Sequence, residues 1–225
     1  MLLWLSFLSH AQAAQFYMWG VGPTAQTNIY PFGYPLSFPT TSVEGANPSE
    51  NMTKPTFVGS IGGKFTAYLN QHLRGAIRPV YSLGSSASGY TGFSVSMEVD
   101  RIVASQNGIQ IFWGGGLGTG GFSFDQGDSG VLSGRTLYLR GHGGTVFISG
   151  QGAIELSLFA ELGFVGEERY VYEDTTYTNG GFFNKDETAS LGWGVYYPII
   201  GIECTGYFGK FYTPTPRKKR RRRRR

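Results

Sequence analysis

The sequence predicts an all-β fold in which eight antiparallel strands run up and down and close into a barrel. Several long segments alternate between apolar and polar residues, which is the pattern of a strand with two different faces. Glycine supplies 35 of the 225 residues and aromatic residues 16%, while only 15% are charged, a composition that favours strands over helices. The connections between these segments are alternately long and short, as in an up-and-down arrangement with an even strand count.

The clearest hairpin lies at residues 92–124, where two alternating segments flank a turn signal at residues 105–108. One face of this hairpin is apolar and carries Phe93, Val95, Met97, Val99, Val103, Ile109, Ile111, Trp113 and Leu117. The opposite face carries Glu98 and Asp100 and then a stripe of glycines: Gly114, Gly116, Gly118 and Gly120. A loop centred on Asn107 sets Glu98 opposite Gly116 and Asp100 opposite Gly114. The glycine stripe then provides space for charged side chains of neighbouring strands.

The same alternation places the other six strands along the chain. They are predicted at residues 15–22, 57–69, 72–84, 135–148, 153–166 and 191–212. Tight connections are expected at Asn70-Gln71 and at Gly150-Gln151, where glycine at the first central position suits a type II′ hairpin. The long connections are rich in Gly, Ser, Pro and Asn, and are expected at residues 23–55, 85–91, 123–134 and 167–190.

Both ends of the chain differ from this barrel region, which spans residues 14–212. Residues 1–13 have an apolar core and an Ala-x-Ala pattern at Ala11 and Ala13, so they are predicted to be a secretory signal peptide, although no basic residue precedes the apolar run. Residues 213–225 form a Pro/Arg-rich tail that is expected to be disordered. The tail supplies nine of the 19 basic residues, so the remainder carries ten basic against 15 acidic residues, a net charge of −5.

The polar faces of the strands decide which side of the barrel is outside. Charged residues share the non-apolar faces: Lys64, Arg74, Arg78, Glu98, Asp100, Arg140, Glu155, Glu161 and Glu203. In a soluble barrel they would form the solvated surface. The apolar faces, however, carry many aromatic residues near strand ends, including Phe57, Tyr81 and Trp113, which suits the aromatic girdles of a membrane barrel. The apolar faces are therefore predicted to face lipid, and the nine charged residues to face the lumen.

These features resemble those of a known superfamily. Residues 58–69, residues 92–121 with the run Trp113-Gly-Gly-Gly-Leu-Gly, and the aromatic ending at residues 207–212 are similar to bacterial eight-stranded outer-membrane barrels of the OmpA transmembrane-domain and OmpX-like type, the small porin-family barrels. The resemblance implies a cell-envelope protein of the bacterial outer membrane with short periplasmic turns and long extracellular loops. It also implies contact with membrane lipid and lipopolysaccharide, and insertion by the barrel-insertion machinery. A monomer is expected.

Two cross-strand ion pairs are predicted from trial registers, in which the centre of each turn or loop sets the pairing of the two strands that it joins. A two-residue turn at Gly150-Gln151 sets Arg140 opposite Glu161, and a loop centred on Ser88 sets Arg78 opposite Glu98. A lumen filled by side chains must pair or hydrate such charges. The pairs could form a packing network that blocks flow, or a gate of the kind that the family resemblance suggests.

Other candidate sites are weak. Residues 116–121 fit the pattern Gly-x-Gly-x-x-Gly, but no helix follows to bind a phosphate, so no nucleotide site is expected. His142 and His72 lack a serine at strand spacing, which leaves a lipid-A-modifying enzyme as a minor alternative and predicts no catalytic residue. The single Cys204 offers neither a disulfide nor a metal cluster, and no cofactor is expected.

The basic tail predicts binding to an anionic surface, through a run that begins Arg217, Lys218, Lys219, Arg220 and Arg221. An anionic envelope polymer or lipid headgroups would be its partner, whereas the export signal and the acidic barrel region argue against nucleic acid. The sequence thus predicts a structural or surface-interaction protein of the outer membrane with at most a narrow gated pore. The alternative is a soluble ligand-binding barrel or a nucleic-acid-binding shell protein.

Overall fold

The structure is a computed structural model that describes residues 18–29, 36–39, 41, 47–55, 57–179, 191, 195–196 and 199–210. The predicted signal peptide at residues 1–13 and the Pro/Arg-rich tail at residues 213–225 lie outside these residues. The same holds for Phe211 and Tyr212 of the predicted aromatic ending.

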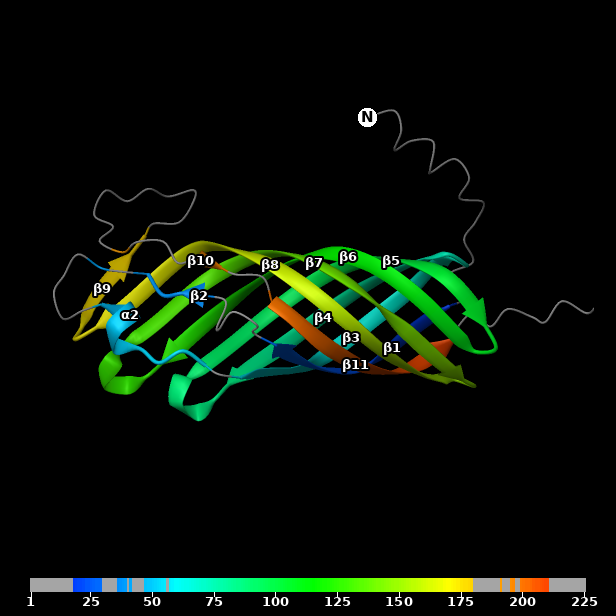
Figure 1. Cartoon of the computed structure of the whole chain (residues 1–225), viewed down its shortest axis with the longest axis horizontal. Helices are drawn as coiled ribbons and strands as arrows, with labels where there is room; N and C mark the ends of the chain where they lie inside the picture. Colours follow the sequence, from blue (N-terminus) through cyan, green and yellow to red (C-terminus); the bar gives the residue numbers. More distant parts are fainter. Residues whose placement is uncertain are drawn as a thin grey trace, which may run out of the picture.

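Eight long antiparallel strands form a closed ring (Figure 1). They are β1 (Trp19–Ile29), β3 (Val58–Asn70), β4 (Leu73–Gly84), β5 (Tyr90–Gln106), β6 (Ile109–Asp125), β7 (Val131–Ser149), β8 (Gly152–Tyr172) and β11 (Ile199–Lys210). Each strand pairs with the next along the chain, and β11 closes the ring by pairing with both β8 and β1. The fold is an eight-stranded antiparallel up-and-down β-barrel of the transmembrane type, as predicted.

The connections define two different ends of the barrel. The turn end carries three two-residue hairpin turns, at Asn107-Gly108, at Gly150-Gln151 and at Gln71-His72, the last of which lies one residue later than expected. In the first two turns, Asn107, Gly108 and Gly150 adopt positive φ as primed turns require. The loop end carries the longer connections, with the 3₁₀ turns η1 (Ser86–Ser88) and η2 (Gly127–Ser129), the short helix α2 (Pro48–Asn51), and the strand β9 (Thr175–Thr178), which pairs with β8. In Figure 1, β9 and α2 lie together at this end.

The strands reach further into the predicted loops than expected. Strand β1 continues to Ile29. The expected loops 85–91 and 123–134 are shorter than predicted and span only residues 85–89 and 126–130. In the expected loop 167–190, β8 continues to Tyr172 and the strand β9 follows. The reason is that apolar side chains still line the inward face there, with Phe124, Leu132 and Tyr170 fully buried. Glu168 is also buried on this face and accepts a hydrogen bond from Asn179 at 3.0 Å, while most of the other polar residues that suggested a loop form the outward face.

The last predicted strand is instead divided. Of the expected segment 191–212, residues 199–210 form β11, while β10 (Val195–Tyr196) pairs with β2 (Leu36–Ser37) and Leu191 makes an isolated bridge to Thr41. Two parts of the chain that lie between barrel strands in sequence therefore meet at the loop end.

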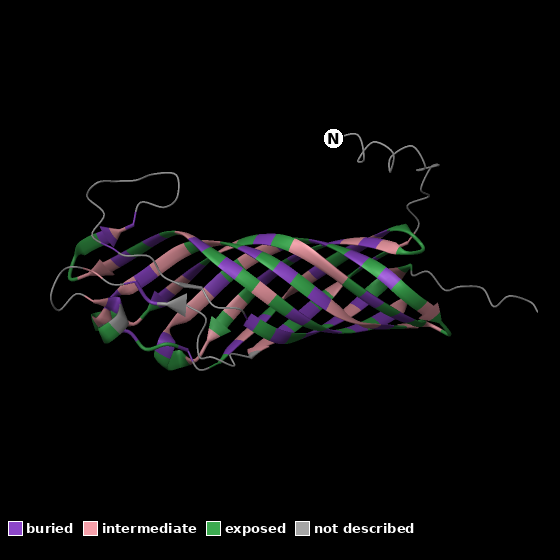
Figure 2. Cartoon of the chain, turned by 45° about the horizontal axis from the view of Figure 1, so that its top comes forward, coloured by how far each residue is buried: buried purple, intermediate pink, exposed green. Residues whose placement is uncertain are grey.

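The two faces of each strand differ as predicted. Figure 2 shows buried and exposed residues alternating along the barrel strands. The seven aromatic residues on the predicted lipid face are all exposed: Phe57, Phe65, Tyr81, Phe93, Trp113, Phe147 and Phe164. The outward apolar belt also includes Met97 at 67% exposure and Leu158 at 63%, which a protein surrounded by water would bury.

Apolar side chains close the interior at both ends. The loop-end cluster consists of Phe38, Met52, Phe122, Phe124, Leu132, Val165, Tyr170, Tyr177 and Leu191. The turn-end cluster consists of Tyr68, Ile102, Phe112, Val146, Ala153 and Tyr207. Gln126 holds the loop end together, since its side chain exchanges two hydrogen bonds of 2.7 Å with the backbone of Thr53 and donates a third to the carbonyl of Ser88.

Candidate functional site: the lumenal charge network

A charge network fills the middle of the barrel between the two apolar clusters. Six strands contribute to it, and their inward side chains come from alternate positions, because successive strand residues point to opposite faces. The members are the nine residues that the sequence assigned to the lumen: Lys64, Arg74, Arg78, Glu98, Asp100, Arg140, Glu155, Glu161 and Glu203. All have side chains at most 1% exposed except Glu161, whose side chain is 11% exposed.

Lys64 lies at the centre of the network. Its Nζ atom is 2.8 Å from Glu155, 3.1 Å from Glu98 and 3.3 Å from Glu203. The three carboxylates come from three different strands, so one ammonium group links β3 to β5, β8 and β11 across the lumen. A buried ammonium is tolerated only where such partners replace its water.

A second group of charges lies nearer the turn end. The guanidinium of Arg74 contacts Asp100 and Glu155, each at 2.7 Å, and stacks over the ring of Phe112 with its Cζ 4.4 Å from the ring centroid. His142 Nε2 lies 2.6 Å from Asp100. The carboxylate of Asp100 is therefore held from both sides, and Arg74 joins the charge network to the turn-end cluster.

A third group lies nearer the loop end and contains two arginines. Arg140 contacts Glu161 and Glu203, with 2.7 Å to the latter, and stacks over Phe159 at 3.9 Å. Arg78 contacts Glu98 at 3.0 Å, and its Nη1 donates to the side-chain oxygen of Gln26 at 2.7 Å. Glu98 and Glu203 each contact both arginines and Lys64, so the groups form one connected network.

The structure confirms one trial register and corrects the other. Arg140 lies directly opposite Glu161, with the turn at Gly150-Gln151 as predicted. Arg78 lies opposite Ser96 and not Glu98, because the loop after β4 is centred one residue earlier than expected. The 3₁₀ turn η1 ends at Gly89, which adopts the left-handed conformation, and this brings Gly84 and Tyr90 together. The Arg78 side chain still reaches Glu98 diagonally.

The glycine stripe of β6 lies against this network in the predicted register, with Gly116 opposite Glu98 and Gly114 opposite Asp100. A Cβ at Gly114 would overlap the carboxylate of Asp100, and one at Gly118 would overlap the ring of Tyr138. At Gly120 it would lie 2.6 Å from the carbonyl oxygen of Phe93. The stripe is thus the space that the inward side chains of β5 and β7 occupy.

Uncharged residues complete the network and were not predicted as part of it. Tyr207 donates to Glu155 at 3.1 Å, Ser96 donates to Glu98 at 3.0 Å, and Gln26 accepts from Arg78. The sequence did indicate that these residues point inward, since each lies an even number of positions from a charged or polar residue on the inward face of its strand. Phase alone, however, does not say which inward side chains will touch.

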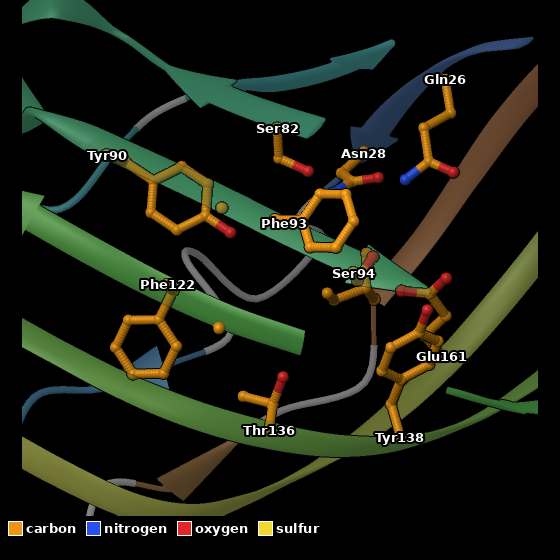
Figure 3. Close-up of a pocket in the computed structure, with 13 residues that line it drawn as sticks. Gln26, Asn28, Ser82, Tyr90, Phe93, Ser94, Phe122, Thr136, Tyr138 and Glu161 are labelled. Atoms are coloured by element: carbon orange, nitrogen blue, oxygen red, sulfur yellow. The ribbon is translucent and has the colours of Figure 1, made fainter. Parts of the chain in front are cut away.

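A small cavity adjoins the charge network inside the lumen. A cavity of about 50 Å³ lies on the loop-end side of the network and is lined by polar groups of Gln26, Ser82, Ser94, Tyr138 and Glu161 (Figure 3). It would hold a few water molecules, since one water needs roughly 10–15 Å³ by this measure. Ligand pockets for small molecules occupy about 300–1,000 Å³. The cavity explains why Glu161 alone retains some exposure.

No helix among the described residues is long and apolar enough to cross a membrane. No group of three or more His, Cys, Asp or Glu side chains in this part of the chain is arranged to hold a metal ion.

Comparison with known proteins supports the fold. No protein-family model matches the chain, and no curated protein matches it in sequence. Among solved structures, the chain is similar to the crystal structure of Neisserial surface protein A, with a TM-score of 0.50 and 12% sequence identity. The match covers 86% of this chain and 97% of that one. At this identity the likeness shows that the two chains share the barrel fold.

Proposed function

We propose that this chain is a bacterial outer-membrane β-barrel protein with a closed lumen and a structural or surface-interaction role. One observation carries the proposal: the outward face is a continuous apolar belt, while the buried interior holds nine charged residues that pair with one another. A soluble protein has the reverse arrangement, and membrane barrels face lipid with their apolar side. The likeness to a Neisserial surface protein supports the fold on which this proposal depends.

The two ends of the barrel suggest an orientation. Short turns face the periplasm and longer connections face outward in barrels of this type, so the turn end would be periplasmic. Four strands, β5 to β8, are 17–21 residues long, whereas the other four have 11–13. Because about 9–11 tilted residues cross the bilayer, the longer strands would project from the membrane at the loop end. This projecting sheet, with β9, is the proposed contact surface.

The lumen is proposed to be a plug. Any path through it would have to cross the loop-end cluster, the charge network and the turn-end cluster, and the cavity on the loop-end side of the network measures only about 50 Å³. Opening a gate would require separating Arg140 from Glu161 and Glu203, and would still leave Phe112 and Tyr207 in the path. We therefore favour the packing network over the gate, and propose no catalytic role.

The soluble alternative requires features that the described residues lack. A ligand-binding barrel needs an apolar pocket of several hundred cubic ångströms inside, whereas this interior is charged and filled. The nucleic-acid alternative depends on the basic tail at residues 217–225, which lies outside the described residues. Within the outer-membrane proposal, that tail contacts anionic envelope polymers, the barrel-insertion machinery inserts the chain, and the protein is a monomer among lipid and lipopolysaccharide.

The proposal is tested by fractionating bacteria that express the full chain. The protein is expected in the outer membrane, extractable only with detergent, and faster-migrating in gels when unheated than when boiled. Recovery in the soluble fraction without a heat-dependent shift would contradict the proposal. The refolded protein in planar bilayers is expected to show no stable conductance, and stable channels would contradict the plug.

A further inference from the structure

The outer face of the barrel has a groove at the loop-end edge of the apolar belt. It crosses β4 to β7, is largely open to the surroundings and offers about 580 Å³ of space. Four outward residues form one row across these strands, since Tyr81 pairs with Phe93, Phe93 with Gly121, and Gly121 with Arg135. The rings of Tyr81 and Phe93 therefore form an aromatic wall on one side of the groove, and Arg135 lies on the other side. The backbone of Gly121 forms the floor between them.

The groove exists because small or folded-back side chains lie between Phe93 and Arg135. Gly121 presents only backbone, and Thr119 donates its hydroxyl to the carbonyl of Thr136 at 3.1 Å. The rings of Tyr81 and Phe93 stand outward, 44% and 54% exposed. The groove is therefore mostly apolar, and it opens onto the surface that would face lipid.

The position of Arg135 is the second observation. Toward the turn end its outward neighbours on β7 are Leu137 and Leu139, and toward the loop end the outward residues of β6 and β8 become Asp125 and Arg169. Arg135 therefore lies where apolar side chains give way to polar ones, which is the depth of lipid headgroups. Its cross-strand partner is Glu167, and the structure records no ion pair between these two described residues. Its exposed guanidinium is available for an anion and matches phosphate geometry.

We propose that this groove binds one phosphorylated amphiphile of the surrounding leaflet, with an acyl chain along Gly121 between the aromatic wall and β7, and a phosphate on Arg135. The inference rests on the proposed membrane location and adds a ligand class and a site to it. Charge complementarity selects the occupant, because the groove is apolar between Phe93 and Gly121 and cationic at Arg135, where apolar outward residues give way to polar ones. A neutral lipid would use only the apolar part.

The test uses the refolded full chain in a neutral detergent, with bound lipid measured by native mass spectrometry. The probe is bisphosphorylated lipid A, compared with the same glycolipid without its phosphates and with inorganic phosphate. Arg135→Gln removes the cation, and Arg169→Gln is its matched control, since Arg169 is an exposed arginine on the outward face of β8 that does not line the groove. Gly121→Leu fills the groove without a backbone clash, because a Cβ there would meet no atom closer than 3.4 Å.

One bound lipid A per barrel is expected. Arg135→Gln should weaken its binding about fivefold, the effect of one arginine near an anionic surface. Gly121→Leu should weaken it about tenfold, because the leucine side chain would displace about two methylene groups of the acyl chain from the groove. Arg169→Gln should leave the affinity unchanged.

Four results would overturn the site. The first is an equal loss in both arginine variants, which would indicate non-specific attraction. The second is unchanged binding in Gly121→Leu, and the third is equal binding of the dephosphorylated lipid. The fourth is displacement of lipid A by equimolar inorganic phosphate, which would indicate a free-anion site. A heat-dependent gel shift of each variant shows that the barrel is folded, so failure of the site is distinct from failure of the membrane location, which fractionation tests.

Discussion

Two glycines on adjacent strands show how differently the inside and the outside of this barrel are built. Gly116 of β6 faces the lumen, where a Cβ would overlap the carbonyl oxygen of Met97 and lie 2.9 Å from Glu98 Cγ. Gly141 of β7 faces outward, and a Cβ there would meet nothing within 4 Å. The lumen therefore constrains the size of its residues, whereas the outer face at Gly141 has room for a larger side chain.

This difference means that the two faces respond to opposite kinds of change. Inside, each charge has partners, so removing one leaves others buried and unpaired. Outside, no partner is needed, but a new charge would have to enter lipid. Substitutions on the two faces therefore test this difference, and the largest effect is expected at the centre of the network.

Replacing Lys64 with methionine should destabilise the folded barrel by about 3–5 kcal/mol, the usual cost of removing one partner of a buried ion pair. The variant keeps a side chain of similar length but leaves Glu98, Glu155 and Glu203 without their shared ammonium. The measurement is reversible urea unfolding in lipid vesicles, followed by tryptophan fluorescence.

The matched control for that variant is Arg101→Met, which removes a cation from the exposed outer face of β5. Its free energy of unfolding should change by no more than about 0.5 kcal/mol. Equal effects of the two substitutions would show that the lumenal charges are hydrated and do not depend on one another.

The outer face gives the next largest expected effect. Leu117 is 58% exposed, and its cross-strand partners Met97 and Leu139 are also exposed and apolar. Leu117→Arg should destabilise the barrel in lipid vesicles by about 2–4 kcal/mol, the cost of an arginine near the middle of the bilayer. In a water-exposed barrel the same substitution would change stability by less than about 0.5 kcal/mol, and that small value would contradict the membrane location.

Strand phase explains how much of this structure could be predicted from the sequence. Alternation placed all nine charged residues on inward faces, and the turn at Gly150-Gln151 set Arg140 opposite Glu161. Phase depends only on neighbouring residues, so one sequence is enough to find it. The long connections were less predictable, because composition cannot distinguish a polar loop from a strand whose outward face is polar, as in β8 beyond Phe164.

Apart from the Arg140–Glu161 pair, the contacts within the network were not predictable, for two reasons. The register of β4 against β5 depends on the conformation of Gly89, which the sequence does not reveal. Lys64 reaches carboxylates on β8 and β11, which lie across the lumen and not on adjacent strands. Such contacts depend on the diameter and closure of the barrel. The sequence could also not show that Phe112 and Tyr207 close the turn end, because inward aromatic residues can equally well line an open pore.

The smallest expected effect concerns the two glycines, Gly116 and Gly141. Gly116→Ala should destabilise the barrel by about 1–3 kcal/mol, the usual cost of overpacking, because the backbone carbonyl of Met97 cannot move aside as a side chain could. Gly141→Ala should be neutral or slightly stabilising, since glycine weakens a strand and the added methyl group meets open space. Both variants are measured by the same urea unfolding. If both were neutral, β5 and β6 would separate without strain, and the lumen would not be packed tightly enough to act as a plug.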